Sequence, residues 1–344
     1  MAIKTIGKIV HFKCHFLILV IFLSIAPISS CIRLQSYHPE TTHQIEDSQD
    51  NYKLDWVRGN IFIRDDKSPL LVAGGRKLAF IGSNAESPYE KLFIVDNSSE
   101  VEISEDCILS IGMDDKFVYV GNCIGGLSSY DLSGKRKWYQ SINGTTEGKI
   151  IQILPSEDSL FIYTEVGHIF HLSRTDGDIQ EEYQPGCSNA VVGQDVIYDL
   201  CNNGLEATSI ESKVRLWMHY LEEPSYGYPL IIGNYLILRT GSETGNIFVF
   251  DRMNGSVLWY TTAGNIIGNL VEYHGLLYSL TTSGQLQGYA INNGQLQTTL
   301  TFTPSITINP AGSPVNAVYL ASDTEKIYVY LGDSLQLFSL HIPK

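Results

Sequence analysis

Apolar and polar residues alternate along most of the chain in short runs, the pattern expected for β-strands. The stretch "GNIFVFDRMNGSVLWY", residues 245–260, contains two such runs on either side of Asn254 and Gly255, a pair that favours a tight hairpin turn. One hairpin is marginally stable in water, so neighbouring sheets must cover its large apolar side chains. The rest of the chain supplies such sheets, because the same pattern recurs.

The recurrence is regular. The turns of five similar hairpins fall at Gly134, Gly177, Lys213, Gly255 and Gly294. These positions are 43, 36, 42 and 39 residues apart, and an apolar segment that predicts an inner strand precedes each hairpin. A period near 40 residues, with about four short strands in each unit, is typical of β-propeller blades. We count seven units over residues 51–344, and the pattern leaves an eighth open. The prediction is an all-β, seven-bladed propeller of four-stranded antiparallel blades.

The tryptophans support this interpretation. Trp138, Trp217 and Trp259 each lie four residues after a turn position, so they share one place in the repeat. Trp56 precedes the first complete unit, in "YKLDWVRG", whereas the last unit, which ends "LFSLHIPK", lacks a fourth strand of its own. We expect the N-terminal strand to pair there and close the ring, which leaves no long exposed sheet edge at the junction. The shared position predicts that these tryptophans pack between blades.

The hairpins also resemble those of a known family. Gly245–Trp259 and Gly126–Trp138 contain a glycine, alternating apolar residues, an aspartate before the turn (Asp251, Asp131) and a tryptophan after it, which is similar to the PQQ-like propeller repeat. The resemblance covers roughly residues 51–344 and is strong in two or three units. It implies a propeller of the non-catalytic bacterial lipoprotein type. A member of that type is an eight-bladed scaffold, so the count of seven argues against direct equivalence.

The N-terminal residues differ from the rest. Three lysines precede the apolar run "FLILVIFLSIAPIS", and residues 1–30 contain no acidic side chain, which is typical of an export signal peptide. The run is shorter than the roughly 20 residues of a comfortable membrane span. It ends in "ISSC", which resembles the lipobox, so we predict removal of residues 1–30 and lipidation of Cys31, with ordinary cleavage as the alternative. Residues 31–50 are polar and lack apolar periodicity, so we interpret them as a tether.

Four further cysteines fall into two symmetric pairs. Cys107 and Cys123 are each eight residues from the centre of a predicted inner hairpin, and Cys187 and Cys201 are each seven residues from the centre of another. Facing residues of antiparallel strands have Cα atoms about 4.5–5.5 Å apart, within disulfide range. Export also permits disulfides. We therefore predict the disulfides Cys107–Cys123 and Cys187–Cys201, with four buried thiols as the alternative.

The net charge and the motifs of the sequence exclude several classes of function. The net charge is −14, and it becomes −17 once the three signal lysines are removed, which disfavours binding to nucleic acid. The sequence contains no signature of α/β-hydrolases, zinc peptidases or P-loop proteins. It also lacks the adjacent cysteine pair of quinoprotein dehydrogenases, and no residue matches their calcium ligands. We therefore predict no catalytic, cofactor-binding or metal-binding residue.

These observations favour an extracytoplasmic, lipid-anchored propeller that binds a protein partner, as a scaffold or assembly factor of the cell envelope. The residue after Cys31 is Ile32 rather than aspartate, so in a Gram-negative cell the anchor would be in the outer membrane. No feature indicates a homo-oligomer. A small-molecule-sensing ectodomain is the alternative, and a PQQ-dependent dehydrogenase-like enzyme is less favoured. Residues 301–316 are a candidate contact loop, with an interblade connection as the alternative.

Overall fold

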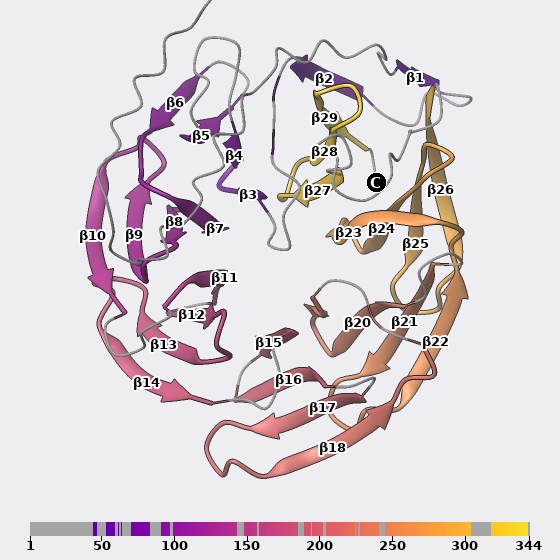
Figure 1. Cartoon of the computed structure of the whole chain (residues 1–344). Helices are drawn as coiled ribbons and strands as arrows, with labels where there is room; N and C mark the ends of the chain where they lie inside the picture. Colours follow the sequence, from indigo (N-terminus) through magenta and orange to yellow (C-terminus); the bar gives the residue numbers. More distant parts are fainter. Residues whose placement is uncertain are drawn as a thin grey trace, which may run out of the picture. The chain divides into compact units, whose positions relative to one another are not determined.

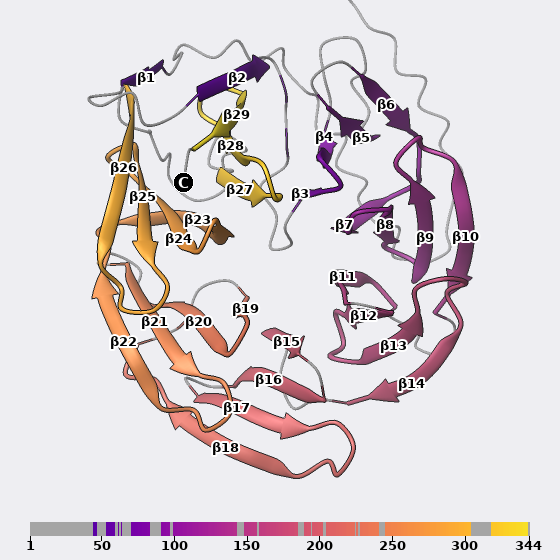
Figure 2. The same cartoon turned by 180° about the vertical axis from the view of Figure 1, so that it is seen from behind.

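Seven antiparallel sheets surround a common centre in the computed structural model (Figures 1 and 2). The structure describes residues 44–46, 53–58, 61, 63, 70–82, 91–96, 99–142, 148–156, 158–184, 189–193, 195–201, 204–223, 225, 228–240, 245–303 and 318–342. All of them belong to the compact unit His38–Lys344. They contain no helix, and so none that could cross a membrane. The predicted all-β, seven-bladed propeller is confirmed.

Each sheet is one blade, and we letter the four strands that all blades share A to D from the centre outward. Blades 1 and 2 consist of β3 (Leu71–Gly74), β4 (Lys77–Gly82), β5 (Lys91–Val95) and β6 (Glu100–Ile103), then β7 (Ile108–Met113), β8 (Phe117–Asn122), β9 (Gly126–Asp131) and β10 (Arg136–Ser141). Blades 3 and 4 consist of β11 (Ile150–Pro155), β12 (Ser159–Thr164), β13 (Ile169–Ser173) and β14 (Ile179–Tyr183), then β15 (Asn189–Gly193), β16 (Val196–Cys201), β17 (Gly204–Ser209) and β18 (Arg215–Tyr220). Blades 5 and 6 consist of β19 (Leu230–Ile232), β20 (Tyr235–Thr240), β21 (Asn246–Asp251) and β22 (Val257–Thr262), then β23 (Ile266–Tyr273), β24 (Leu276–Thr281), β25 (Gln285–Ala290) and β26 (Leu296–Thr303).

Blade 7 closes the ring with strands from both ends of the propeller. Its A, B and C strands are β27 (Val318–Ser322), β28 (Ile327–Leu331) and β29 (Gln336–His341), and its D strand is β2 (Lys53–Arg58). β2 pairs antiparallel with β29, with Trp56 opposite Ser339. The predicted closure by the N-terminal strand is therefore confirmed.

The blades are apolar on both faces because each is covered by two neighbours. In the hairpin β21–β22, the side chains of Ile247, Val249 and Phe250 are completely buried. Ile247 and Val249 point to one face of the blade and Phe250 to the other, since successive side chains of a strand alternate. One hydrophobic cluster covers blade 6 and blade 7, and another joins blade 7 to blade 1. The core is therefore a set of interblade layers.

Blade 6 carries a fifth, short strand. β1 (Gln44–Glu46) pairs antiparallel with the end of β26, and Ile45 lies opposite Phe302. The Ile45 side chain packs against the buried cluster that contains Phe302. These residues lie within the segment that we interpreted as a tether, so at least Gln44–Glu46 is fastened to the propeller. A single apolar residue among polar ones shows no periodicity, which is why the sequence does not reveal this strand.

A disulfide joins Cys107 and Cys123 at the end of the hairpin β7–β8, with a Cα–Cα separation of 5.6 Å. A register shift between Ile108 and Ser110 displaces the pairing by one residue and places the two cysteines opposite each other. The hairpin β15–β16 pairs Asn189 with Leu200, one residue out of register with a pairing of Cys187 and Cys201. Cys187, Cys31 and residues 304–316 lie outside the described residues. The second disulfide, the lipidation and the contact loop therefore stay predictions.

Replacing both Cys107 and Cys123 by alanine should lower the free energy of unfolding by about 3 kcal/mol, because the bond closes a loop of about 15 residues in the unfolded chain. Urea unfolding with and without a reductant measures this. The double variant should be insensitive to the reductant, and an unchanged urea midpoint of the reduced wild-type protein would contradict the prediction.

Candidate binding cavity

The repeated tryptophans and glycines connect successive blades. The indole N–H of each tryptophan donates a hydrogen bond to a carbonyl oxygen in the C–D turn of the next blade. The pairs are Trp138 with Arg174 (3.2 Å), Trp217 with Arg252 (3.0 Å) and Trp259 with Ile291 (2.7 Å). Each acceptor lies three residues before the turn glycine of that blade, Gly177, Gly255 or Gly294. The indole ring rests on this glycine, because a β-carbon there would approach the ring to 2.5–2.7 Å. We call this the tryptophan–glycine contact.

The other junctions depart from this arrangement, and two of them show how. In blade 7, Arg58 donates to the carbonyl oxygen of Asp96 in blade 1 at 3.1 Å, and its guanidinium lies 5.2 Å from the ring centre of Trp56. At the junction of blades 3 and 4, Glu181 stands at the tryptophan position and Lys213 at the turn position. Lys213 still has a φ of 56°, so the turn conformation is kept where no indole has to be seated. The remaining repeat residue, Gly134, faces Val101 of blade 1.

A cavity of ≈ 780 Å³ lies among the A–B turns of blades 1, 2, 6 and 7. Its charged lining is Asp114, Asp115, Glu272, Asp323, Lys116 and Arg174. Residues far apart in the sequence meet here because the ring places the A–B turns of blades 1, 2, 6 and 7 beside one another. None of these lining residues was a candidate from the sequence.

The turn of blade 7 is held by its first residue. Asp323 Oδ1 accepts hydrogen bonds from the backbone N–H groups of Glu325 and Lys326, at 2.7 and 2.9 Å. Its Oδ2 accepts the hydroxyl of Tyr328 at 3.1 Å. Burial raises the pKa of Tyr328, and the Asp323 charge adds to this, so the phenol remains a protonated donor.

The turn of blade 2 repeats this geometry. Asp114 Oδ1 accepts the N–H groups of Lys116 and Phe117, at 2.7 and 2.9 Å, and Oδ2 accepts the hydroxyl of Tyr119 at 2.8 Å. Arg174 of blade 3 lies 3.4 Å from the same carboxylate. The aspartate and tyrosine are five residues apart in both blades, and this repeated spacing is the sequence signal by which the two turns could have been found.

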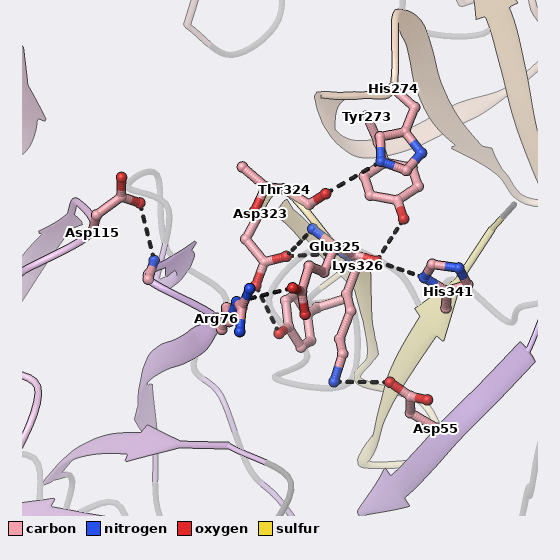
Figure 3. Close-up of polar contacts among 12 residues, drawn as sticks. Asp55, Arg76, Asp115, Tyr273, His274, Asp323, Thr324, Glu325, Lys326 and His341 are labelled. Carbon is pink, nitrogen blue, oxygen red and sulfur yellow. Dashed lines mark hydrogen bonds and ion pairs between the residues drawn. The ribbon is translucent and has the colours of Figure 1, made fainter. Parts of the chain in front are cut away.

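The turn of blade 7 also binds its neighbours on both sides (Figure 3). From blade 6, the Tyr273 hydroxyl donates to the carbonyl oxygen of Glu325 (2.5 Å), and His274 Nε2 donates to that of Thr324 (3.2 Å). From blade 1, Arg76 Nε lies 2.9 Å from the Glu325 carboxylate. Burial raises the pKa of Tyr273 to about 12, with a contribution from the Asp323 charge. The turn therefore fixes one wall of the cavity.

A second ion pair fastens the closing strand beside this wall. Lys326 Nζ lies 2.8 Å from Asp55 Oδ2, and both side chains are largely buried. His341 Nδ1 donates to the carbonyl oxygen of Glu325 at 2.9 Å, which requires the proton on that nitrogen. The end of β29 and the strand β2 thus contact the turn that borders the cavity.

The chemistry of the cavity suits binding. The carboxylates of Asp114, Glu272 and Asp323 already accept backbone N–H groups of their own turns. A nucleophile needs a base within hydrogen-bond reach, whereas the Ser322 hydroxyl donates to the carbonyl oxygen of Glu272 at 2.6 Å. Within the described ranges, no group of three or more His, Cys, Asp or Glu side chains could hold a metal ion.

Comparison with known proteins identifies related sequences and folds. A family described as "Outer membrane protein assembly factor BamB" matches residues 96–295. No curated protein matches the chain at a significant level. The crystal structure of BamB from Moraxella catarrhalis has 15% sequence identity and a TM-score of 0.51, covering 84% of this chain and 99% of that one. A chain in the mitotic checkpoint complex (14% identity, TM-score 0.65, 91% and 99% covered) and the WD40 propeller of Doa1 (11%, 0.61, 85% and 97%) share the fold.

Proposed function

The chain belongs to the family described as outer membrane protein assembly factor BamB, and from this we propose that it is a non-catalytic scaffold that binds another protein in the cell envelope. The family match over residues 96–295 carries the proposal. A rigid ring supports it, because loops held by a rigid scaffold commonly carry binding function. We further propose that the signal peptide directs export, that Cys31 is lipidated, and that the anchor is in the outer membrane if the cell is Gram-negative.

The cavity at the A–B turns is the first place to look for the partner. A photo-crosslinking amino acid at Lys116, an exposed cavity residue, should capture a specific envelope protein in intact membranes, identified by mass spectrometry. The matched control is Ile124, which is 77% exposed in the B–C turn of the same blade. Capture of the same proteins from both positions, or of none from either, would contradict a partner at the cavity.

A small-molecule-sensing role is the second candidate, because a volume of ≈ 780 Å³ lies in the range of ligand sites, roughly 300–1,000 Å³. A ligand screen by thermal shift distinguishes the two. A compound that raises the melting temperature of the wild-type protein, and not of a Lys116→Ala variant, would favour the sensor over the scaffold.

A further inference from the structure

The outer D strands differ in how they are protected against pairing with further strands. The free edge of a sheet presents unpaired N–H and C=O groups, and charged side chains on an edge strand oppose the addition of another strand. Five D strands contain at least one Lys, Arg, Asp or Glu: β2, β6, β10, β14 and β18. Two contain none, β22 ("VLWYTT") and β26 ("LQTTLTFT").

One of the two uncharged edges already carries an added strand. β1 pairs antiparallel with Thr301–Thr303 of β26, and Ile45 is packed beside Phe302. The pairing of β26 with β25 has a register shift between Gly288 and Tyr289 of β25, as the D strands of other blades also have, so this irregularity does not prevent pairing beyond it. The structure thus contains an example of strand addition to an uncharged blade edge.

The other uncharged edge, β22, is the D strand of the adjacent blade 5 (Figure 1). The pairing of β22 with β21 also has one register shift. Beyond this shift, residues Trp259–Thr262 pair regularly with β21. Leu258 is 47% and Tyr260 66% exposed, and the Tyr260 ring stacks on Phe248 with centroids 5.4 Å apart. Within the described residues no strand pairs with the outer side of β22, so this edge combines unpaired backbone groups with apolar side chains and no charged one.

We propose that β22 is a docking edge, which accepts an extended, uncharged segment of the partner protein as an additional strand of blade 5. This rests on the proposed scaffold function and names the partner chemistry. Backbone hydrogen bonds supply affinity in this mode, and alternate side chains of the segment pack on Tyr260 and Leu258. An acidic segment is disfavoured because the chain itself has a net charge of −14, and β22 offers no side chain to pair with a charge.

The test uses the purified full chain and a short fluorescent peptide of alternating threonine and valine with blocked ends. We expect saturable binding by fluorescence anisotropy, and binding about tenfold or more weaker for Tyr260→Lys, which places a charge on the edge. The control Ile124→Lys adds the same charge at an exposed position of blade 2 and should bind like the wild type. A peptide N-methylated at every residue cannot donate a hydrogen bond along either edge and should not bind.

Each other outcome overturns the proposal. Absence of binding to the wild type, equal binding to Tyr260→Lys, or equal binding of the N-methylated peptide would show that β22 does not accept a strand. Self-association of the wild-type chain that Tyr260→Lys abolishes would show that a second copy occupies the edge. Because peptide binding is measured with purified protein, failure here leaves the crosslinking test of the scaffold function unaffected.

Discussion

Replacement of Trp259 by alanine should lower the free energy of unfolding by about 3 kcal/mol, within the range for removal of a large aromatic side chain from a packed site. The indole N–H donates to Ile291 at 2.7 Å, and the ring rests on Gly294 of the next blade. Loss of the indole removes this hydrogen bond and exposes the contact between blades 5 and 6 to water. Urea unfolding monitored by circular dichroism measures the change.

Neighbouring positions supply the controls. Tyr260→Ala, at the next residue, removes a ring that is 66% exposed and should cost far less. Gly294 has a φ of 70°, and its replacement by alanine would press a β-carbon against the indole, so Gly294→Ala should also destabilise. The cost should be smaller when Trp259 is already alanine, because residues in contact couple. Purely additive effects would contradict the tryptophan–glycine contact.

Replacement of Asp199 by asparagine should stabilise the protein at neutral pH. Asp199 lies in β16 and is 6% exposed, and its Oδ1 has no hydrogen-bond partner within the described structure. Burial raises the pKa of Asp199 to about 7, and the charge of Glu206 on the adjacent strand contributes. In the unfolded chain the pKa of an aspartate is about 3.9. The folded state holds the proton of Asp199 more tightly than the unfolded state. The stability that this proton contributes is therefore fully present below about pH 4 and is lost as the pH rises to about 7.

The difference between Asp199→Asn and wild type isolates this carboxyl from the other titrating groups. It should be near zero at pH 4 and grow to at most about 4 kcal/mol at pH 7–8, since one pKa unit is worth about 1.4 kcal/mol. Glu206→Gln should reproduce a smaller part of the gain. A variant that is less stable than the wild type at pH 7 would indicate that the ionised carboxylate has a favourable partner in solution.

Much of the fold follows from local pattern. The alternation of side chains and the period near 40 residues predict seven blades, and the displaced "YKLDWVRG" segment predicts the closing strand. Such features depend on residues close in sequence, or on one segment that lacks a partner in its own unit. The turn glycines were predicted for their backbone conformation. Their second role, as seats for the indoles, depends on a contact between blades that no single unit contains.

The cavity was missed for a related reason. Asp114 and Asp323 are more than two hundred residues apart, and each is an ordinary turn aspartate in its own hairpin. Only the ring brings their turns to one place, and only the contacts of the Asp323 turn with Tyr273 and Arg76 show that this wall is fixed. Strand β1 was missed because Ile45 stands among polar residues and forms no alternating pattern with its neighbours.

The closing strand determines when the ring can close during synthesis. β2 (Lys53–Arg58) is synthesised before any complete blade, whereas its partner β29 (Gln336–His341) is synthesised after the other six blades. Throughout elongation the first blades can stack on one another while β2 has nothing to join. A ribosome that stalls before residue 336 would therefore leave an open arc with two unprotected flanks, because closure of the ring depends on β29.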